Sequence, residues 1–172
     1  MENKIKGFKD TIAWYDANAE QYAANIELFP SEDLLDRFAN AVGGGGKVLD
    51  AGCAAGRDCG LLKDRGLVPV GIDLSKSLIE IARNKHPDIE FRQGNILNLP
   101  FEDESFDGVW AHASLVHLET TEEVVRALRE FNRVLKPGGV MHVFVKQQLG
   151  NEKTSVVSDT LSGHERFFSV VY

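Results

Sequence analysis

The chain has 172 residues and a formal net charge of −7, from 19 Lys and Arg against 26 Asp and Glu, and 43% of its residues are hydrophobic. This length suits one domain with its own core, and the acidic balance argues against a nonspecific nucleic-acid binder, whose affinity comes from clustered cations. The start, MENKIKGFKD, has no apolar signal segment, and no apolar run is long enough to cross a membrane. We expect a cytoplasmic protein with no membrane partner.

The chain contains only two cysteines, Cys53 and Cys59, at neither zinc-ligand nor CxxC spacing. We therefore expect buried, reduced thiols in preference to a redox pair, with no disulfide or metal scaffold. A basic stripe also recurs at helical spacing: Arg126, Arg129, Arg133 and Lys136. Glutamates lie within four residues of it, which indicates a solvated helix face rather than a nucleic-acid surface.

Two helical patterns come first, at about 9–25 and 31–41, and a glycine run follows at 43–46. We interpret residues 1–45 as an N-terminal helical cap and 46–172 as a sheet core, both within a single domain. The glycine run is expected to be a flexible hinge between the two.

From there on, short apolar runs alternate with helical patterns. The runs are rich in β-branched and aromatic residues, which predicts strands at 47–51, 67–72, 88–92, 106–112 and 139–146. Helices are expected to fill the gaps between the strands. Such alternation predicts an α/β fold, a doubly wound and mostly parallel sheet covered on both faces.

Two of these helices have clear end signals. The helix at 121–135 has Thr120 or Thr121 as its cap and the sequence KPGG, residues 136–139, as its stop. Another helix begins at Ser75, whose hydroxyl can cap it.

The first strand leads into the turn VLDAGCAAGRD, residues 48–58. Ligands of open parallel sheets bind beyond the carboxyl ends of the strands, where this turn lies. A dinucleotide site needs G-x-G-x-x-G, but counting from Gly52 the other two positions are Ala54 and Arg57. The mismatch disfavours an NAD-dependent oxidoreductase.

The same turn resembles the first motif of the class I S-adenosylmethionine-dependent methyltransferases, an acidic residue followed by x-Gly-x-Gly-x-Gly. Asp50, Gly52 and Gly56 match, and Ala54 replaces the middle glycine. One methyl group is tolerable there if the backbone keeps a negative φ, and it could narrow the slot for the methionine part of the cofactor. The segments VGIDLS, FRQGNILNLPFEDESFDGVWA and RVLKPGG resemble later motifs, so the likeness covers about residues 10–147 and points to the small-molecule branch.

The resemblance implies a Rossmann-like methyltransferase fold with S-adenosylmethionine as cofactor. The backbone around Gly52 would receive the amino-acid end and Asp73 the ribose, while Leu74 and Ile96 would flank an adenine that Asn95 orients. The implied binding set also includes the turn residues Asp50, Cys53 and Gly56, and Ala111 on the fourth strand.

Three further side chains are candidates for the cofactor. Arg57 either pairs with the cofactor carboxylate or is a solvated residue at a helix start. Tyr15 and Tyr22 lie on an apolar stripe of the segment WYDANAEQY, which resembles the family's lid helix. They can pack on the domain and also offer a hydroxyl to the carboxylate or a ring face to the sulfonium.

The chemistry of methyl transfer needs mainly alignment of donor and acceptor. His112 and His117, in HASLVHL, follow the fourth strand and are either catalytic proton acceptors or hydrogen-bonded structural residues. The fourth strand lacks Asn/Asp-Pro-Pro-Tyr, and no Pro-Cys pair occurs, so elimination leaves a small-molecule methyl acceptor. A noncatalytic or degenerate S-adenosylmethionine-binding protein is the alternative.

The end of the chain departs from the family pattern, in which two more strands and a helix follow the fifth strand. HERFFSVVY, residues 164–172, resembles the start of that region and then the sequence stops. We expect the last helix and strand to be missing. The apolar tail then folds beside the fifth strand, joins a homodimer through the tails of two copies, or frays.

Overall fold

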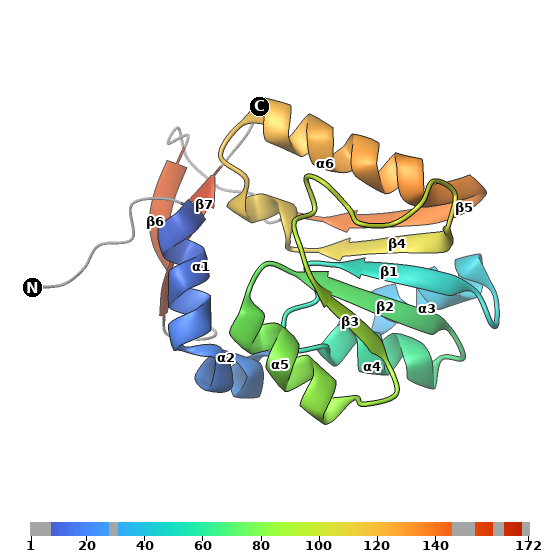
Figure 1. Ribbon diagram of the computed structural model, residues 1–172, viewed down its shortest axis with the longest axis horizontal. Helices are drawn as coiled ribbons and strands as arrows, with labels where there is room; N and C mark the ends of the chain where they lie inside the picture. The colour runs from blue at the N-terminus through green and yellow to red at the C-terminus, as the bar shows by residue number, and fades with distance from the viewer. Residues whose placement is uncertain (1–7, 28–30, 146–153, 160–163, 170–172) are drawn as a thin grey trace, which may run out of the picture.

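The computed structural model describes the backbone of residues 8–27, 31–145, 154–159 and 164–169, and the side chains of 11–27 and 31–145. Its centre is a five-stranded sheet in the order β3-β2-β1-β4-β5, in which every neighbouring pair is parallel (Figure 1). The strands are β1 Lys47–Ala51, β2 Val68–Asp73, β3 Glu90–Gln93, β4 Phe106–His112 and β5 Leu135–Phe144. The predicted doubly wound parallel sheet is confirmed.

Helices cover both faces of this sheet and its carboxyl edge. They are α1 Phe8–Ala17, α2 Ala19–Ile26, α3 Glu32–Val42, α4 Arg57–Asp64, α5 Lys76–Lys85, the 3-10 turn η1 Leu115–His117, and α6 Thr121–Val134. The expected first helix is thus divided in two at Asn18. Helices α1 and α2 lie against α5, at the end toward which the strands point (Figure 1).

The alternation of side chains along the strands divides the core between the two faces. Leu49 and Val109 point to the α6 side, where they pack with Phe131. Their neighbours Val48 and Trp110 point the other way and join the side chains of α3 and α4. All five of these residues are fully buried.

Both predicted helix caps are present. The Ser75 side chain accepts a hydrogen bond from the backbone N–H of Leu78 at the start of α5. The Thr120 hydroxyl accepts one from the N–H of Glu123 at the start of α6. Each cap satisfies an N–H that has no partner within its helix.

The expectation that helices fill every gap is wrong between β3 and β4. Residues 94–105 form an irregular loop there. Its carbonyls are held by Arg133 of α6, whose guanidinium donates to the carbonyl oxygens of Leu99 and Phe101 at 3.0 and 2.8 Å. The same side chain pairs with Asp103 and Glu130. This part of the basic stripe therefore fastens a loop rather than simply facing solvent.

The chain also enters β5 earlier than expected. Helix α6 ends at Val134, and β5 begins at Leu135 instead of residue 139. Phe106 of β4 pairs with Leu135, but Gly108 pairs with Val140, so the KPGG sequence forms a bulge in the strand.

The glycine run at 43–46 is a hydrogen-bonded turn rather than a free hinge. The N–H of Gly45 donates to the carbonyl of Gly66, and the N–H of Val68 donates to the carbonyl of Gly46. These bonds fasten the run to the start of β2, so α3 is held on the sheet.

The last described elements are β6 Thr154–Asp159 and β7 His164–Ser169, which pair antiparallel in a separate two-stranded sheet. Within the described residues β5 pairs with β4 alone, so the alternative in which the tail adds a strand beside β5 is not seen there. Strand β7 instead contacts α1 and η1. Residues 170–172 of the predicted tail lie outside the described residues.

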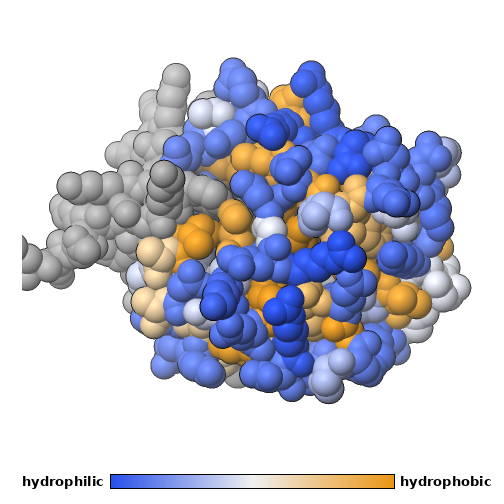
Figure 2. All heavy atoms as spheres, viewed as in Figure 1, coloured by the Kyte–Doolittle hydropathy of each residue, from blue (hydrophilic) through white to orange (hydrophobic). Residues whose placement is uncertain are grey.

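The face seen in Figure 2 is largely hydrophilic, with apolar side chains gathered in separate spots. Among the helices that the structure describes, none has the length and apolarity to cross a bilayer.

Candidate active site

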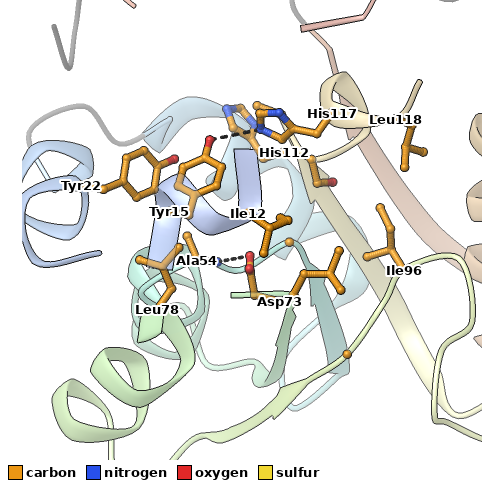
Figure 3. Close-up of a pocket in the computed structure, with 15 residues that line it drawn as sticks. Ile12, Tyr15, Tyr22, Ala54, Asp73, Leu78, Ile96, His112, His117 and Leu118 are labelled. Atoms are coloured by element: carbon orange, nitrogen blue, oxygen red, sulfur yellow. Dashed lines mark hydrogen bonds between the residues drawn. The ribbon is translucent and has the colours of Figure 1, made fainter. Parts of the chain in front are cut away.

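A pocket lies beyond the carboxyl ends of the sheet strands, between the sheet and helices α1 and α2 (Figure 3). The turns after β1, β2, β3 and β4 each contribute lining residues. Eight of the sequence-predicted site residues lie together in the lining: Tyr15, Tyr22, Gly52, Asp73, Leu74, Ile96, His112 and His117. The pocket therefore brings together residues separated by about a hundred positions in the chain.

Asp73 ends β2 and places its carboxylate on the pocket wall. Its Oδ2 accepts from the backbone N–H of Ala54 at 2.9 Å (Figure 3). Its Oδ1 accepts from the backbone N–H of Ser75, also at 2.9 Å. Burial raises the pKa of Asp73, and the N–H groups of Ser75 and Ala54 act in the opposite direction. Since each carboxylate oxygen can accept more than one bond, this side chain can still receive hydroxyl groups from a ligand.

The turn after β1 has a conformation that the sequence reasoning missed. Ala54 has φ +48°, so the condition under which its methyl group would be tolerated without strain, a negative φ, is not met. Its N–H donates a hydrogen bond to Asp73. Glycine adopts the left-handed backbone conformation at this position more readily than alanine does. Gly52 has φ +92°, and a Cβ there would lie 2.4 Å from the Cβ of Ser114. Gly52 therefore keeps the floor of the pocket open.

Two tyrosines form the wall that α1 and α2 contribute. The hydroxyl of Tyr15 lies 3.2 Å from Nε2 of His117 on η1, which joins this wall to the sheet side of the pocket (Figure 3). Tyr22 packs edge-on against Tyr15, with ring centroids 4.8 Å apart. Helix α1 is also anchored by Asp16, which accepts hydrogen bonds from the Ser75 hydroxyl and the Ser77 N–H.

His112 ends β4 and has polar partners at both ring nitrogens. Its Nε2 lies 3.2 Å from the hydroxyl oxygen of Ser31, and its Nδ1 lies 3.3 Å from Nε2 of His142. His112 is thus held in place on the side of the pocket opposite Asp73's strand.

Other predicted residues lie outside the lining, in a buried cluster beneath the turn. Arg57 donates to Asp58 at 2.7 Å and to the carbonyl of Ile26 at 2.6 Å, so it is neither solvated nor directed into the pocket. Burial raises the pKa of Asp50, whose Oδ2 accepts from the Cys59 thiol. Both cysteines are buried and free, as expected.

Four more predicted residues have contacts elsewhere. Asn95 Oδ1 accepts from the N–H of Leu97 at 2.9 Å, which shapes the loop after β3. Ala111 is fully buried in the core on the α6 side, and Cys53 is buried against α4 and α5. Gly56 is the N-cap residue of α4 with φ +82°, and a Cβ there would lie 2.8 Å from the Phe91 ring. These residues support the pocket without lining it.

The sequence reasoning missed several lining residues, of which Ser114 is the most informative. Its Oγ is the one buried side-chain polar atom in the described part of the chain without a hydrogen-bond partner. It follows His112 in the HASLVHL segment, where only the histidines stood out. Ile12, Leu78 and Leu118 were also missed, because an apolar lining residue has the same pattern as a core residue.

These features fit a nucleoside bearing a polar tail. Leu74 and Ile96 offer apolar surfaces, Asp73 offers acceptors for hydroxyl groups, and Ser114 and the Gly52 turn offer a polar, uncrowded floor. A parallel sheet with such a crevice at its carboxyl edge defines a Rossmann-like nucleotide-cofactor protein.

Comparison with known proteins narrows this class. The model of the methyltransferase domain family matches residues 49–143, more than half of the chain. The chain belongs to the class I S-adenosylmethionine-dependent methyltransferase family, whose cofactor is S-adenosylmethionine.

Curated relatives and solved structures agree with this assignment. The chain is 30% identical over 154 residues to the methyltransferase GfsG of Streptomyces halstedii, covering 84% of this chain and 54% of that protein. It is 37% identical over 98 residues to the demethylmenaquinone methyltransferase of Chlorobaculum parvum, covering 56% and 39%. The crystal structure of the PH0226 protein from Pyrococcus horikoshii has a TM-score of 0.66 and 31% identity, covering 81% of this chain and 72% of that one. The chain spans about half or less of the length of the two curated relatives.

Proposed function

We propose that the chain binds S-adenosylmethionine in this pocket and transfers its methyl group to a small-molecule acceptor. The observation that carries the proposal is the Asp73 carboxylate, oriented by the N–H groups of Ala54 and Ser75 at the end of β2. In this proposal Asp73 receives the ribose hydroxyls, and Leu74 and Ile96 flank the adenine. The open floor at Gly52 and the Ser114 hydroxyl receive the amino-acid end.

When bound, the cofactor supplies an activated methyl group, so the protein's task is alignment and exclusion of water. Tyr15 and Tyr22 close the pocket on the α1 and α2 side, and the Tyr15 contact with His117 holds that wall across it. This arrangement limits the entry of water from the side of these helices.

His112 is the proposed proton acceptor for the methyl acceptor. It lies at the end of β4, lines the pocket, and has Ser31 as a nearby hydroxyl partner. His117 is tied to Tyr15, so we assign it to positioning the wall rather than to proton transfer. The acceptor itself is a small molecule with a dissociable proton.

Two measurements test this proposal. Calorimetry with S-adenosylmethionine, S-adenosylhomocysteine and NAD should give binding of the first two and none of NAD. Formation of S-adenosylhomocysteine is then followed with phenols, thiols and amines, and with bulk tRNA as an acceptor of another class. Turnover on a small-molecule class is the expected result. Cofactor binding without turnover would favour a noncatalytic binding protein, and NAD binding alone would overturn the proposal.

A further inference from the structure

Four flat rings stack on the α3 side of β4 and β5. The strand register pairs Trp110 with His142 and His112 with Phe144. Trp110 and His142 have ring centroids 3.9 Å apart at an interplanar angle of 16°, and His112 and Phe144 are 4.5 Å apart at 9°. The two histidine planes consequently differ by only 9°, with their facing nitrogens 3.3 Å apart.

A contact between two neutral imidazoles contains a single proton. Burial lowers the pKa of His142, which favours its neutral form near neutral pH. The shared proton belongs either to Nδ1 of His112 or to Nε2 of His142. The first choice leaves Nε2 of His112 with a lone pair, which can accept from the Ser31 hydroxyl.

Only the first choice lets His112 itself take up a second proton. In the first choice a second proton goes to Nε2 of His112. Each of its two N–H groups then faces an acceptor, the Ser31 oxygen on one side and His142 Nε2 on the other. In the second choice the added proton would go to His142, whose partly buried ring lies flat on the indole of Trp110. Burial there disfavours a cation.

We propose that His142 is the positioning residue of His112, holding it in the Nδ1–H tautomer so that its Nε2 carries the lone pair that accepts a proton. This inference rests on the proposed function, in which His112 takes the proton of the methyl acceptor. The X–H bond of the acceptor breaks, its electron pair stays on X, and the proton goes to Nε2 as the Ser31 hydroxyl turns aside. The Nδ1–H bond to His142 stabilises the resulting imidazolium.

The position of His142 is itself fixed from beneath. Its platform, Trp110, is fully buried and donates from Nε1 to Asp58 Oδ2 at 2.9 Å. Phe38 of α3 packs on the same indole at 5.2 Å between centroids. These contacts hold the indole in place, which keeps His142 opposite His112.

The tautomer of His112 can be read from its side-chain ¹⁵N resonances in the full chain, without cofactor, at neutral pH. A His112→Gln sample assigns the signals. We expect the Nδ1–H form in the wild type and a shift toward the Nε2–H form, favoured by free histidine in water, in His142→Phe. That variant keeps a ring on Trp110 but has no nitrogen.

Two controls separate hydrogen bonding from packing. Phe144→Leu removes the ring stacked on His112 and should leave the Nδ1–H form unchanged. His142→Gln offers an amide oxygen as acceptor and should also retain it. An Nε2–H form in the wild type, or an Nδ1–H form that persists in His142→Phe, overturns the proposal. If His142→Phe does not fold, the wild type and His142→Gln decide, because an Nε2–H form in either one contradicts it.

Calorimetry with S-adenosylhomocysteine on the same samples keeps the two proposals distinguishable. A wild type that fails to bind S-adenosylhomocysteine would overturn the proposed function, while the tautomer measurement would still decide the role of His142.

Discussion

Replacing Ala54 by glycine tests the strain in the turn after β1. Ala54 has φ +48° while its N–H donates to Asp73. A left-handed conformation costs an L-residue about 1–2 kcal/mol, and glycine loses about 0.5–1 kcal/mol more backbone entropy than alanine on folding. The difference predicts that Ala54→Gly stabilises the fold by about 0.5–1 kcal/mol, which for a domain of this length raises Tm by about 1–4 °C.

Calorimetric melting of the wild type, Ala54→Gly and Ala55→Gly provides the test. Ala55 is the matched control because it is fully buried and does not have a positive φ. The Ala55→Gly variant loses about 0.8 kcal/mol of methyl burial and also bears the backbone entropy cost of glycine. The Tm of Ala55→Gly should therefore fall. If Ala54→Gly lowers Tm as much as Ala55→Gly does, the reasoning from backbone strain is refuted. We also expect Ala54→Gly to tighten S-adenosylhomocysteine binding by at most about 1 kcal/mol, since the methyl group lines the pocket.

Three further predictions concern single carboxylates and amides. Asp73→Ala should weaken S-adenosylhomocysteine binding by about 1–3 kcal/mol, and unchanged affinity in calorimetry would contradict the ribose role. Asn95→Asp should change that affinity by less than about twofold, because the Asn95 oxygen is engaged by Leu97; a large gain would mean that residue 95 reaches the adenine. Because the pKa of Asp50 is raised in the folded state, the folded protein keeps a proton that the unfolded chain releases above pH 3.8. The free energy of unfolding therefore falls as the pH rises from 3.8 through the pKa of Asp50 in the folded state. The advantage of Asp50→Asn over the wild type in urea melts should therefore grow with pH, whereas Asp107→Asn should show the opposite trend, because bonds from Lys136 and the Lys47 N–H lower the pKa of Asp107.

The sequence predicts those parts of the fold that depend on local signals. The strand patterns locate β1 and β4 at their observed bounds, and Ser75 and Thr120 cap helices as expected. The loop at 94–105 could not be predicted in this way. It is stabilised by Arg133, about 30 residues further along the chain, which donates to its carbonyl groups.

In the candidate site, too, roles that depend on local signals were predictable and roles that depend on long-range contacts were not. Asp73 was predictable because a polar residue that ends a parallel strand faces the crevice. Arg57 was not, since its partner is the Ile26 carbonyl on α2, a contact that depends on how α2 packs. The conformation of Ala54 was missed for a similar reason, because the bond to Asp73 that orients its N–H comes from another strand.

The buried charges beneath the turn connect both halves of the pocket. Arg57, the first residue of α4 after the turn, pairs with Asp58, and Asp58 accepts from the indole of Trp110. The ring of His142 stacks on Trp110, and His142 contacts His112 at the edge of the pocket. Removing one member would leave a buried charge or donor without its partner, which is costly. This chain of contacts therefore links the turn on the cofactor side to the histidine on the acceptor side, and it gives a physical reason for an acidic residue, Asp58, to be buried beside a glycine turn.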